Sequence, residues 1–290
     1  NKRKGRKATN ITAKQTLTVK QDSWEKNENH VFNIFANEDV VNLIQKIENK
    51  STPLIELADF TLGLTPYDKY KGHTQAQIKG KVFHADHQKD ESFKKLLSGG
   101  DIVRYGISWN GKKWIKYGKW LGAPREKRFF TEPRIIVRQI VSGKPLRVYA
   151  GYSEEEFYNA QIGFNILTKD EEKIRIKYLL ALFDSKLINF YHTEKYLDKS
   201  KNLFQKILIQ NAKQFPIKVP DETKQTKICS LVDRMLSLTK RLDELKDKAT
   251  DEKVKIEKEM EKLDSQIDQL VYELYNLTPK EIKLVEESME

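Results

Sequence analysis

The hydrophobic positions after Pro220 recur at alternating spacings of three and four residues. Such spacing places them at the a and d positions of a coiled-coil heptad. A charged turn at 246–251 separates two rows of this kind. We therefore expect an antiparallel helical hairpin with seams at Ile228, Leu231, Met235, Leu238, Leu242 and Leu245, and at Ile256, Met260, Leu263, Ile267, Leu270 and Leu274.

A further short helix is expected after the second row. Thr278 is suited to the N-cap, Pro279 to the first helical position and Glu281 to a capping box. The single cysteine, Cys229, lies beside the first seam, and we interpret it as a packing residue.

The pattern before Pro220 is mixed. Residues 31–35 predict a short strand, and Asn37 can cap a helix that begins near Glu38. Residues 54–72 predict a strand or short helix that runs into a Gly/Pro loop. The apolar side of the helix after Asn37 would hold Val40, Val41, Leu43, Ile44 and Ile47.

The middle of the chain changes from a strand pattern to a helix pattern. Residues 101–148 form short apolar or aromatic runs, with a hairpin signal at Asn110-Gly111. Residues 170–195 indicate helix, and residues 204–210 a strand. We predict an α+β fold in three segments: an arm at 1–50, a β-rich mixed module with packed helices at 51–220, and the antiparallel coiled-coil hairpin at 221–290.

Charge is unevenly distributed over these segments. The whole chain has a net charge of +11. Residues 221–290 hold 13 Lys and Arg against 18 Asp and Glu, so residues 1–220 have a net charge of +16. This asymmetry favours a polyanion-binding part joined to a scaffold part, although a merely solvated basic surface is an alternative.

The basic residues are densest between 101 and 147, where twelve stand against three acidic residues. Lysines neutralise phosphates, and arginines can form two hydrogen bonds with a guanine edge. We expect these cations to contact nucleic acid and the interleaved aromatic residues to fill the core of a sheet. The aromatic residues are Tyr105, Trp109, Trp114, Tyr117, Trp120, Phe129 and Phe130.

Catalytic signals are mostly absent. No glycine-rich cofactor loop or P-loop occurs. Asp221-Glu222-Thr223-Lys224 resembles a nuclease signature superficially, but its acidic residues are adjacent and better suited to capping a helix. His84-Ala-Asp86-His87 could supply three metal ligands, but a surface loop is the better interpretation. We expect no cofactor and no metal in this chain.

Other features bear on the compartment. No apolar run approaches the length of a membrane-spanning helix. One cysteine excludes an intrachain disulfide framework and favours a reducing compartment, so we expect a cytoplasmic protein without a membrane partner.

An ordered set of motifs resembles a known family. It begins with GLTP (63–66), LLSGGDIVRYGI (96–107), WIKYGKWLG (114–122) and FFTEPRIIVRQIV (129–141), and continues with YNAQ (158–161), YLLALFDSKLINFYH (178–192) and FPIKVPDETKQTKICSLVD (215–233). Residues 263–288 complete the set. Over about 50–290 this order resembles the TaqI-like C-terminal specificity domain of type IIG restriction–modification enzymes.

The resemblance implies a target recognition domain at 51–220 and a spacer at 221–290. In such enzymes an upstream domain methylates adenine N6 with S-adenosylmethionine, and a nuclease domain often precedes it. We therefore expect this chain to read duplex DNA for a larger adenine-specific methyltransferase, which can also be an endonuclease. S-adenosylmethionine and Mg²⁺ belong to those other domains, and the hairpin could contact a partner domain.

The DNA contacts are expected on two loops. Lysines of the 112–128 region would anchor phosphates, and one or more arginines would read bases. Thr65 and Tyr67 would join them from a second loop. The full set is Thr65, Tyr67, Arg104, Tyr105, Lys112, Lys113, Trp114, Lys116, Lys119, Arg125, Lys127, Arg128, Arg134 and Arg138.

Three alternatives stay open at this point. A type I specificity subunit usually carries two recognition domains and two conserved helices, whereas only one of each is visible here. A stand-alone metal-dependent nuclease would need a site that the motifs do not reveal. A protein–protein scaffold would use the acidic hairpin alone.

Overall fold

The computed structural model describes residues 38–198, 205–246 and 250–289. The chain divides into two compact units between Leu43 and Ile44. Helix α2 (Glu38–Glu48) crosses this boundary and begins where the sequence predicts. The expected strand at 31–35, the cap at Asn37 and the basic arm lie outside the described residues.

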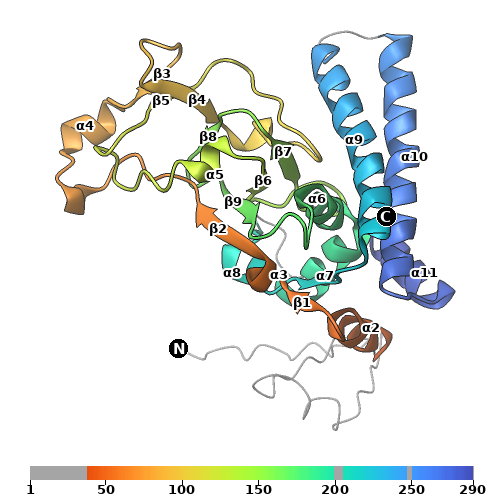
Figure 1. Cartoon of the computed structure of the whole chain (residues 1–290). Helices are drawn as coiled ribbons and strands as arrows, with labels where there is room; N and C mark the ends of the chain where they lie inside the picture. The colour runs from red at the N-terminus through yellow and green to blue at the C-terminus, as the bar shows by residue number, and fades with distance from the viewer. Residues whose placement is uncertain (1–37, 199–204, 247–249, 290) are drawn as a thin grey trace, which may run out of the picture. The chain divides into compact units, whose positions relative to one another are not determined.

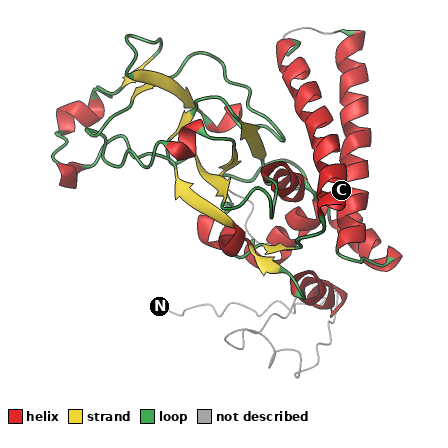
Figure 2. Ribbon diagram, viewed as in Figure 1, coloured by secondary structure: helices red, strands yellow, loops and turns green. Residues whose placement is uncertain are grey.

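Two four-stranded sheets form the β part of the second unit (Figure 2). The central sheet is antiparallel throughout, in the order β2 (Ala58–Leu62), β9 (Gly163–Thr168), β6 (Arg134–Arg138) and β7 (Ala150–Ser153). The second sheet has the order β3 (His84–Ala85), β5 (Trp114–Lys116), β4 (Phe93–Leu97) and β8 (Tyr158–Asn159), with β4 and β8 parallel. A two-stranded pair joins β1 (Thr52–Pro53) to β10 (Pro216–Ile217).

Short helices connect these strands, and the two sheets share a core. Ile136 of the central sheet packs with Leu97 of the second sheet, and Ile102 and Phe157 complete the cluster. The connecting helices are α3 (Leu54–Leu57), η2 (Lys69–Lys71), α4 (Gln75–Lys79), η3 (Gly99–Asp101) and α5 (Arg128–Thr131).

Helix α6 (Ile176–Asp184) is the centre of the helical part. Eight of its nine residues are buried, because it lies between the central sheet and the hairpin. Ser185 ends it and accepts the Ile188 N–H at 3.3 Å, which starts α7 (Lys186–Tyr196). The predicted helical segment at 170–195 is therefore two helices.

Two local predictions are wrong. Asn110-Gly111 makes a turn, in which the Asn110 side chain accepts the Lys112 N–H at 3.0 Å, but no hairpin, because β5 pairs with β3 and β4 instead. Trp109 is not in a strand and donates its indole N–H to Leu96 O at 3.2 Å. Residues 205–208 make one antiparallel β-bridge, between Lys206 and Ile140, but no strand, and α8 (Ile209–Lys213) begins directly after them.

The C-terminal hairpin has the predicted form. Helices α9 (Glu222–Glu244) and α10 (Asp251–Leu274) lie side by side (Figure 1), and all twelve predicted seam positions are buried or half-buried. Asp221 caps α9 by accepting the Lys224 N–H at 3.0 Å, as predicted. The capping box of Thr278 and Glu281 starts α11 (Pro279–Ser288).

A second buried face of the hairpin packs on the rest of the unit, and the seam spacing did not predict it. On α9 the Gln225 side chain accepts the Arg175 N–H at 3.0 Å and donates to Lys173 O at 3.0 Å. The other members of this face are Cys229, Val232, Thr239, Asp268, Val271 and Tyr272.

Four side chains, here named the carboxylate clamp, join the hairpin to α6 and the 102–107 loop: Arg104, Tyr105, Asp184 and Asp264. The Arg104 guanidinium makes two 2.7 Å bonds with the Asp264 carboxylate of α10 and a third with Asp184 O. The Tyr105 hydroxyl donates to Asp264 at 2.9 Å. The buried Asp184 carboxylate accepts N–H groups from Tyr105 and Ala150 at 3.0 and 3.2 Å.

No helix among the described residues combines the length and the apolar character needed to cross a bilayer.

We predict that Asp268, beside the clamp, makes the stability of the chain pH-dependent. Burial, together with repulsion from Asp264, raises the pKa of Asp268 to about 7, although it accepts the Lys186 N–H at 2.8 Å. The folded state therefore keeps a proton that the unfolded state releases, so this contribution to stability is lost as pH rises from about 4 to about 7.

The variant D268N removes that titration and keeps an oxygen for the Lys186 N–H. Between about pH 5.5 and 7.5, its free energy of unfolding should fall by about 1–2 kcal/mol less than that of the wild type, measured by urea unfolding. The variant E257Q changes an exposed carboxylate of the same helix and should follow the wild type. Parallel pH profiles for D268N and the wild type would contradict the assignment.

We also predict that Gly106 is required for the close approach of the 102–107 loop to α9. A Cβ at Gly106 would lie 2.8 Å from Thr239 Cγ2. The variant G106A should therefore lose about 1–3 kcal/mol of stability. Adding T239S, which removes that methyl group but keeps the hydroxyl bonded to Met235 O, should restore most of the loss. The matched control G100A, with no atom within 4 Å of the new Cβ, should be neutral.

Candidate nucleic-acid interface

The second sheet has basic and aromatic side chains on one face, of which Phe93 is buried and the others are half-buried. Lys95 pairs with Trp114, and Phe93 with Lys116, across β4 and β5. Because directly opposed residues share a face and neighbours along a strand alternate, these four side chains lie on the same face. The opposite face holds Ile115 and Leu96, which belong to a buried cluster with Leu64, Leu121, Phe130 and Tyr158. The sheet is thus anchored from one side.

Two loops beside this sheet are fastened to each other. Thr65 and Ala123 exchange backbone hydrogen bonds of 2.8 and 2.9 Å. The Gly122 N–H donates to Pro66 O at 3.3 Å, and the His73 ring lies 2.8 Å from Trp120 O through Nε2. Both predicted loops therefore come together, as a single supported surface.

The aromatic residues between 101 and 147 differ in how deeply they are buried. Tyr105, Phe129 and Phe130 are buried, as the core interpretation predicts. Trp109 and Trp114 are half-buried and meet edge to face at 5.2 Å between ring centroids. Trp120 is 44% exposed, with the Lys116 ammonium 5.3 Å from its ring centre.

Five of the predicted cations are exposed around the second sheet: Lys112, Lys113, Lys119, Arg125 and Lys127. Within the described ranges, none of them forms an ion pair. Their charge is therefore available to an external anion. Lys116 is half-buried beside Trp120 on the same sheet.

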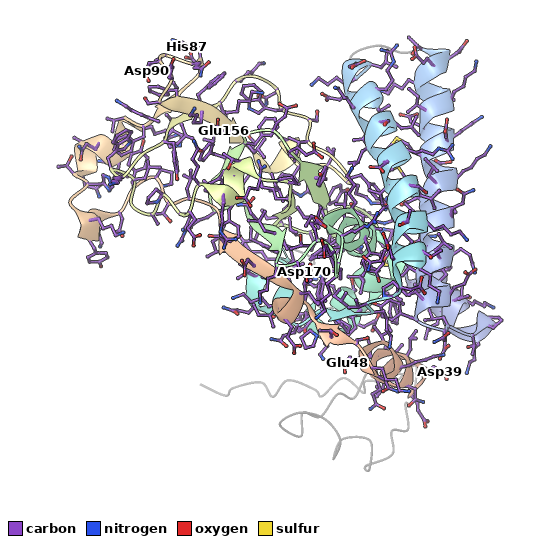
Figure 3. All side chains as sticks on the ribbon, in the orientation of Figure 1. Asp39, Glu48, His87, Asp90, Glu156 and Asp170 are labelled. Atoms are coloured by element: carbon purple, nitrogen blue, oxygen red, sulfur yellow. The ribbon has the colours of Figure 1, made fainter. Side chains whose placement is uncertain are left out.

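Sequence reasoning missed a second group of lysines on the same sheet and its loops. These are Lys69, Lys71, Lys79, Lys81 and Lys89, all exposed. These lysines precede residues 101–147, the segment with the highest density of basic residues, and that density alone does not reveal them. Counting charge over residues 64–128 would have found them, because that span holds 15 basic and 6 acidic residues. Figure 3 marks the β3–β4 loop by His87 and Asp90, on the far side of the unit from the hairpin.

Arg104 and Tyr105 do not join this surface. Both belong to the carboxylate clamp, and Tyr105 is 1% exposed. The two were predicted as DNA contacts, but their side chains face α10 across the inside of the fold. The reason is the half-buried Asp264, which lies about 160 positions further along the chain and which no local pattern reveals.

Arg134 is also inside the fold. It is fully buried on β6 and donates to four backbone carbonyls, those of Glu132, Ser153, Glu155 and Phe157, at 2.8–3.4 Å. Burial lowers the pKa of its guanidinium to about 10. It fastens the 153–157 segment to β6, and its predicted role in base reading does not fit this position.

Two other predicted arginines are partly engaged. Arg138 stacks on Tyr149 at 3.9 Å, donates to Ile140 O at 3.0 Å and bonds the Ser142 hydroxyl. Arg128 pairs with Asp59 at 3.0 Å and with Glu126 at 2.9 Å. Each of these guanidinium groups already has partners within the chain.

The second-loop residues are held in place as well. The Tyr67 hydroxyl accepts the Phe83 N–H and meets His84 Nδ1, both at 2.9 Å, and its ring stacks on Phe83. Burial raises the pKa of Tyr67. Thr65 is half-buried and accepts a 3.2 Å bond from the Gln161 side chain.

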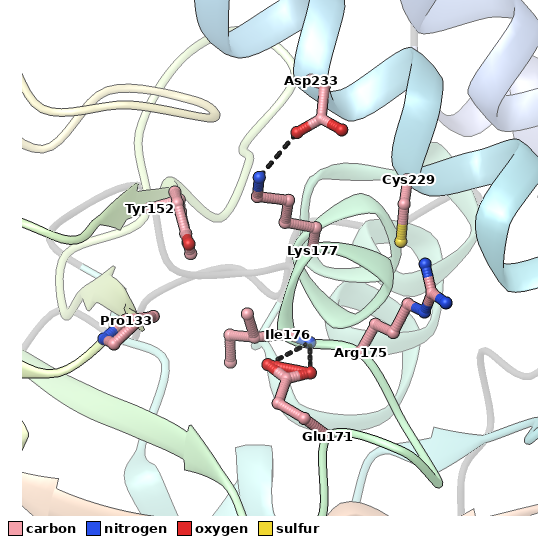
Figure 4. Close-up of a pocket in the computed structure, with 8 residues that line it drawn as sticks. All are labelled: Pro133, Tyr152, Glu171, Arg175, Ile176, Lys177, Cys229 and Asp233. Atoms are coloured by element: carbon pink, nitrogen blue, oxygen red, sulfur yellow. Dashed lines mark hydrogen bonds and ion pairs between the residues drawn. The ribbon is translucent and has the colours of Figure 1, made fainter.

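A pocket of about 390 Å³ lies elsewhere, between β7, the start of α6 and α9 (Figure 4). Its charges are satisfied internally, because Lys177 pairs with Asp233 at 2.7 Å and the Glu171 carboxylate accepts the Ile176 N–H. Burial raises the pKa of Cys229 to about 11, so its thiol stays protonated at neutral pH. These groups stabilise the joint between α6 and the hairpin.

The candidate metal ligands near His84 do not converge. His84 contacts Tyr67, whereas the exposed His87 pairs with its neighbour Asp86 at 2.7 Å. Over residues 38–198, 205–246 and 250–289, no group of three or more His, Cys, Asp or Glu residues is placed to hold a metal ion.

Comparison with known proteins agrees with the motifs in the sequence. The chain is 25% identical over 240 residues to a putative type II restriction enzyme and methyltransferase of Methanocaldococcus jannaschii. The matched region covers 82% of this chain but only 18% of that relative.

Solved structures give weaker likenesses. The type IIL restriction–modification enzyme MmeI in complex with DNA matches at a TM-score of 0.45 and 12% identity, over 83% of this chain and 36% of that chain. The S subunit of a type I restriction–modification system from M. genitalium matches at a TM-score of 0.38 and 12% identity, over 69% and 42%. At this level neither likeness decides between the two classes.

The family comparison assigns the β-rich part. Residues 94–217 match the family described as the TaqI-like C-terminal specificity domain. The matched span includes β4, β5, β6 and α6, and therefore most of the second sheet, the clamp loop and the cations of the 112–127 loops. Residues 94–217 are thus similar to the TaqI-like C-terminal specificity domain, the family that the order of the sequence motifs predicts.

Proposed function

We propose that this chain is the sequence-reading part of a restriction–modification enzyme and binds a specific duplex-DNA site. The observation that carries this proposal is the group of exposed cations on the second sheet and its loops, which have no carboxylate partner within the described chain. The match of residues 94–217 to a specificity domain supports it.

The lysines would bind the DNA backbone. An ammonium group on a flexible stem neutralises a phosphate from many directions and releases counterions, but it carries little sequence information. Lys112, Lys113, Lys119 and Lys127 would therefore set the position of the duplex. The lysines before residue 90 would extend the same contact along the backbone.

The hairpin would fix the distance to a neighbouring domain. The carboxylate clamp and the buried face of α9 hold α9–α10 against the specificity domain, so a domain attached to the hairpin would keep a set orientation. We retain the division into an arm at 1–50, a recognition module at 51–220 and a spacer at 221–290 as part of this proposal.

The chemistry would belong to other domains of a longer parent. The chain spans 18% of the curated relative that it matches. That relative bears the name of a restriction enzyme and methyltransferase. We propose that an adenine-specific methyltransferase domain, with its S-adenosylmethionine, and any Mg²⁺-dependent nuclease act on the DNA that this chain positions, in the cytoplasm.

The test is a selection from random duplex DNA. The 290-residue chain is mixed with the pool across a salt series, and the bound fraction is sequenced. The proposal expects an enriched asymmetric motif of about five to seven base pairs, with an affinity that falls as salt rises. Binding without an enriched motif, or no binding at low salt, would overturn it.

We predict that removing lysines of the second sheet weakens binding to all sequences. In the variant K112A/K113A/K119A, the slope of log affinity against log salt should become shallower by about one for each phosphate that the variant no longer neutralises. The enriched motif should stay the same, because phosphate contacts carry no sequence information. Fluorescence anisotropy with target and scrambled duplexes measures both quantities.

A matched control changes three exposed lysines of α10. The variant K255A/K258A/K262A removes the same charge from the hairpin. It should leave the slope nearly unchanged, since none of these three lysines lies on the second sheet or its loops. Equal slopes for the two triple variants would show that net charge alone, and not the second sheet, attracts DNA.

A further inference from the structure

Arg125 differs from the other arginines of the described chain. Its side chain has no ion pair, hydrogen bond or ring contact within residues 38–198, 205–246 and 250–289. Every other arginine in these ranges has at least one such partner: Arg104, Arg128, Arg134, Arg138, Arg147, Arg175, Arg234 and Arg241. Of the five arginines that the sequence put forward as base readers, Arg125 is thus the one whose five donors are all free.

The chain around Arg125 prevents its neutralisation. Glu126 is adjacent in sequence and is the acidic residue closest to it along the chain. Arg128 binds that carboxylate at 2.9 Å and also pairs with Asp59 of β2 at 3.0 Å. Glu126 is therefore held by another cation, and Arg125 keeps its full charge for an external partner.

The backbone at Arg125 is strained and firmly supported. Its φ is +62°, a region in which a side chain costs energy and glycine does not. The Tyr117 hydroxyl donates to Arg125 O at 3.2 Å, and Ala123, two residues earlier, is paired with Thr65. Just after it, α5 carries the buried Phe129 and Phe130. The Arg125 side chain has no partner in the described chain, so it adds nothing to the stability of this loop. A glycine would adopt the same positive φ at lower cost.

We propose that Arg125 reads a guanine in the major groove of the target, a role that rests on the function proposed above. Guanine presents the O6 and N7 acceptors side by side, and the planar guanidinium can donate to both at once. Because the loop is held by hydrogen bonds, the direction of the guanidinium is restricted before binding, and less conformational entropy is lost on binding. Lys119 and Lys127, exposed on either side along the chain, would hold the adjacent phosphates.

The experiment compares R125A, R125K and R125G with the wild type in the 290-residue chain. Selection from random duplex DNA should give the same motif except at one guanine, where all three variants lose preference. Affinity for the wild-type target should fall by about 5- to 150-fold, the range for a bidentate base contact. R125K should keep the wild-type salt slope, because lysine keeps the positive charge. It should still lose the guanine preference, because an ammonium group lacks the planar pair of donors of a guanidinium.

A target with one modified base tests whether Arg125 binds the N7 atom of the guanine. Replacing the read guanine by 7-deazaguanine removes the N7 acceptor and should weaken binding of the wild type but not of R125A. The melting temperature of R125G should equal or exceed that of the wild type, because glycine relieves the positive φ. This separates loss of reading from loss of folding.

The results separate the role of Arg125 from the proposed function. An enriched motif that is unchanged in all three variants would overturn the role of Arg125 and leave the proposed function standing. A full rescue by R125K would also overturn it, since a phosphate contact needs only charge. A wild-type chain that enriches no motif would overturn the proposed function itself, and the role of Arg125 with it.

Discussion

The structure depends on one partly buried electrostatic constraint, the pairing of Arg104 with the carboxyl groups of the buried Asp184 and the half-buried Asp264. A charged group inside a protein is tolerated only when it is paired and hydrogen-bonded. Here each carboxylate belongs to a different helix, and the cation belongs to the connection between β4 and β5. Satisfying all three at once fixes α6, α10 and the 102–107 loop against one another.

The sequence predicted best where structure is decided locally. The heptad spacing gave both helices of the hairpin, and the caps at Asp221 and Thr278 lie where the helices begin. In these cases the residues that determine the structure lie within one or two turns of each other. The similarity of residues 94–217 to the specificity-domain family was also predictable, because the order of short motifs along the chain carries it.

The candidate interface was less predictable because it depends on partners far apart in sequence. A pattern of cations cannot tell Arg104, bound to a carboxylate on α10, from Arg125, bound to nothing within the described chain. The motif residues Arg104 and Arg134 prove to be structural, since each satisfies groups inside the fold. The strand pairing failed at Asn110-Gly111 for the same reason, since β5 finds its partners in β3 and β4.

The clamp has a consequence for how such a protein can diversify. The loops at 86–92 and 112–127 contribute no side chain to the clamp or to the buried face of α9. Mutations there can accumulate without altering the joint that sets the reach of the hairpin. Under the proposed function, a lineage could therefore change its DNA target by substitutions in these loops alone, while the geometry of the joint is inherited unchanged.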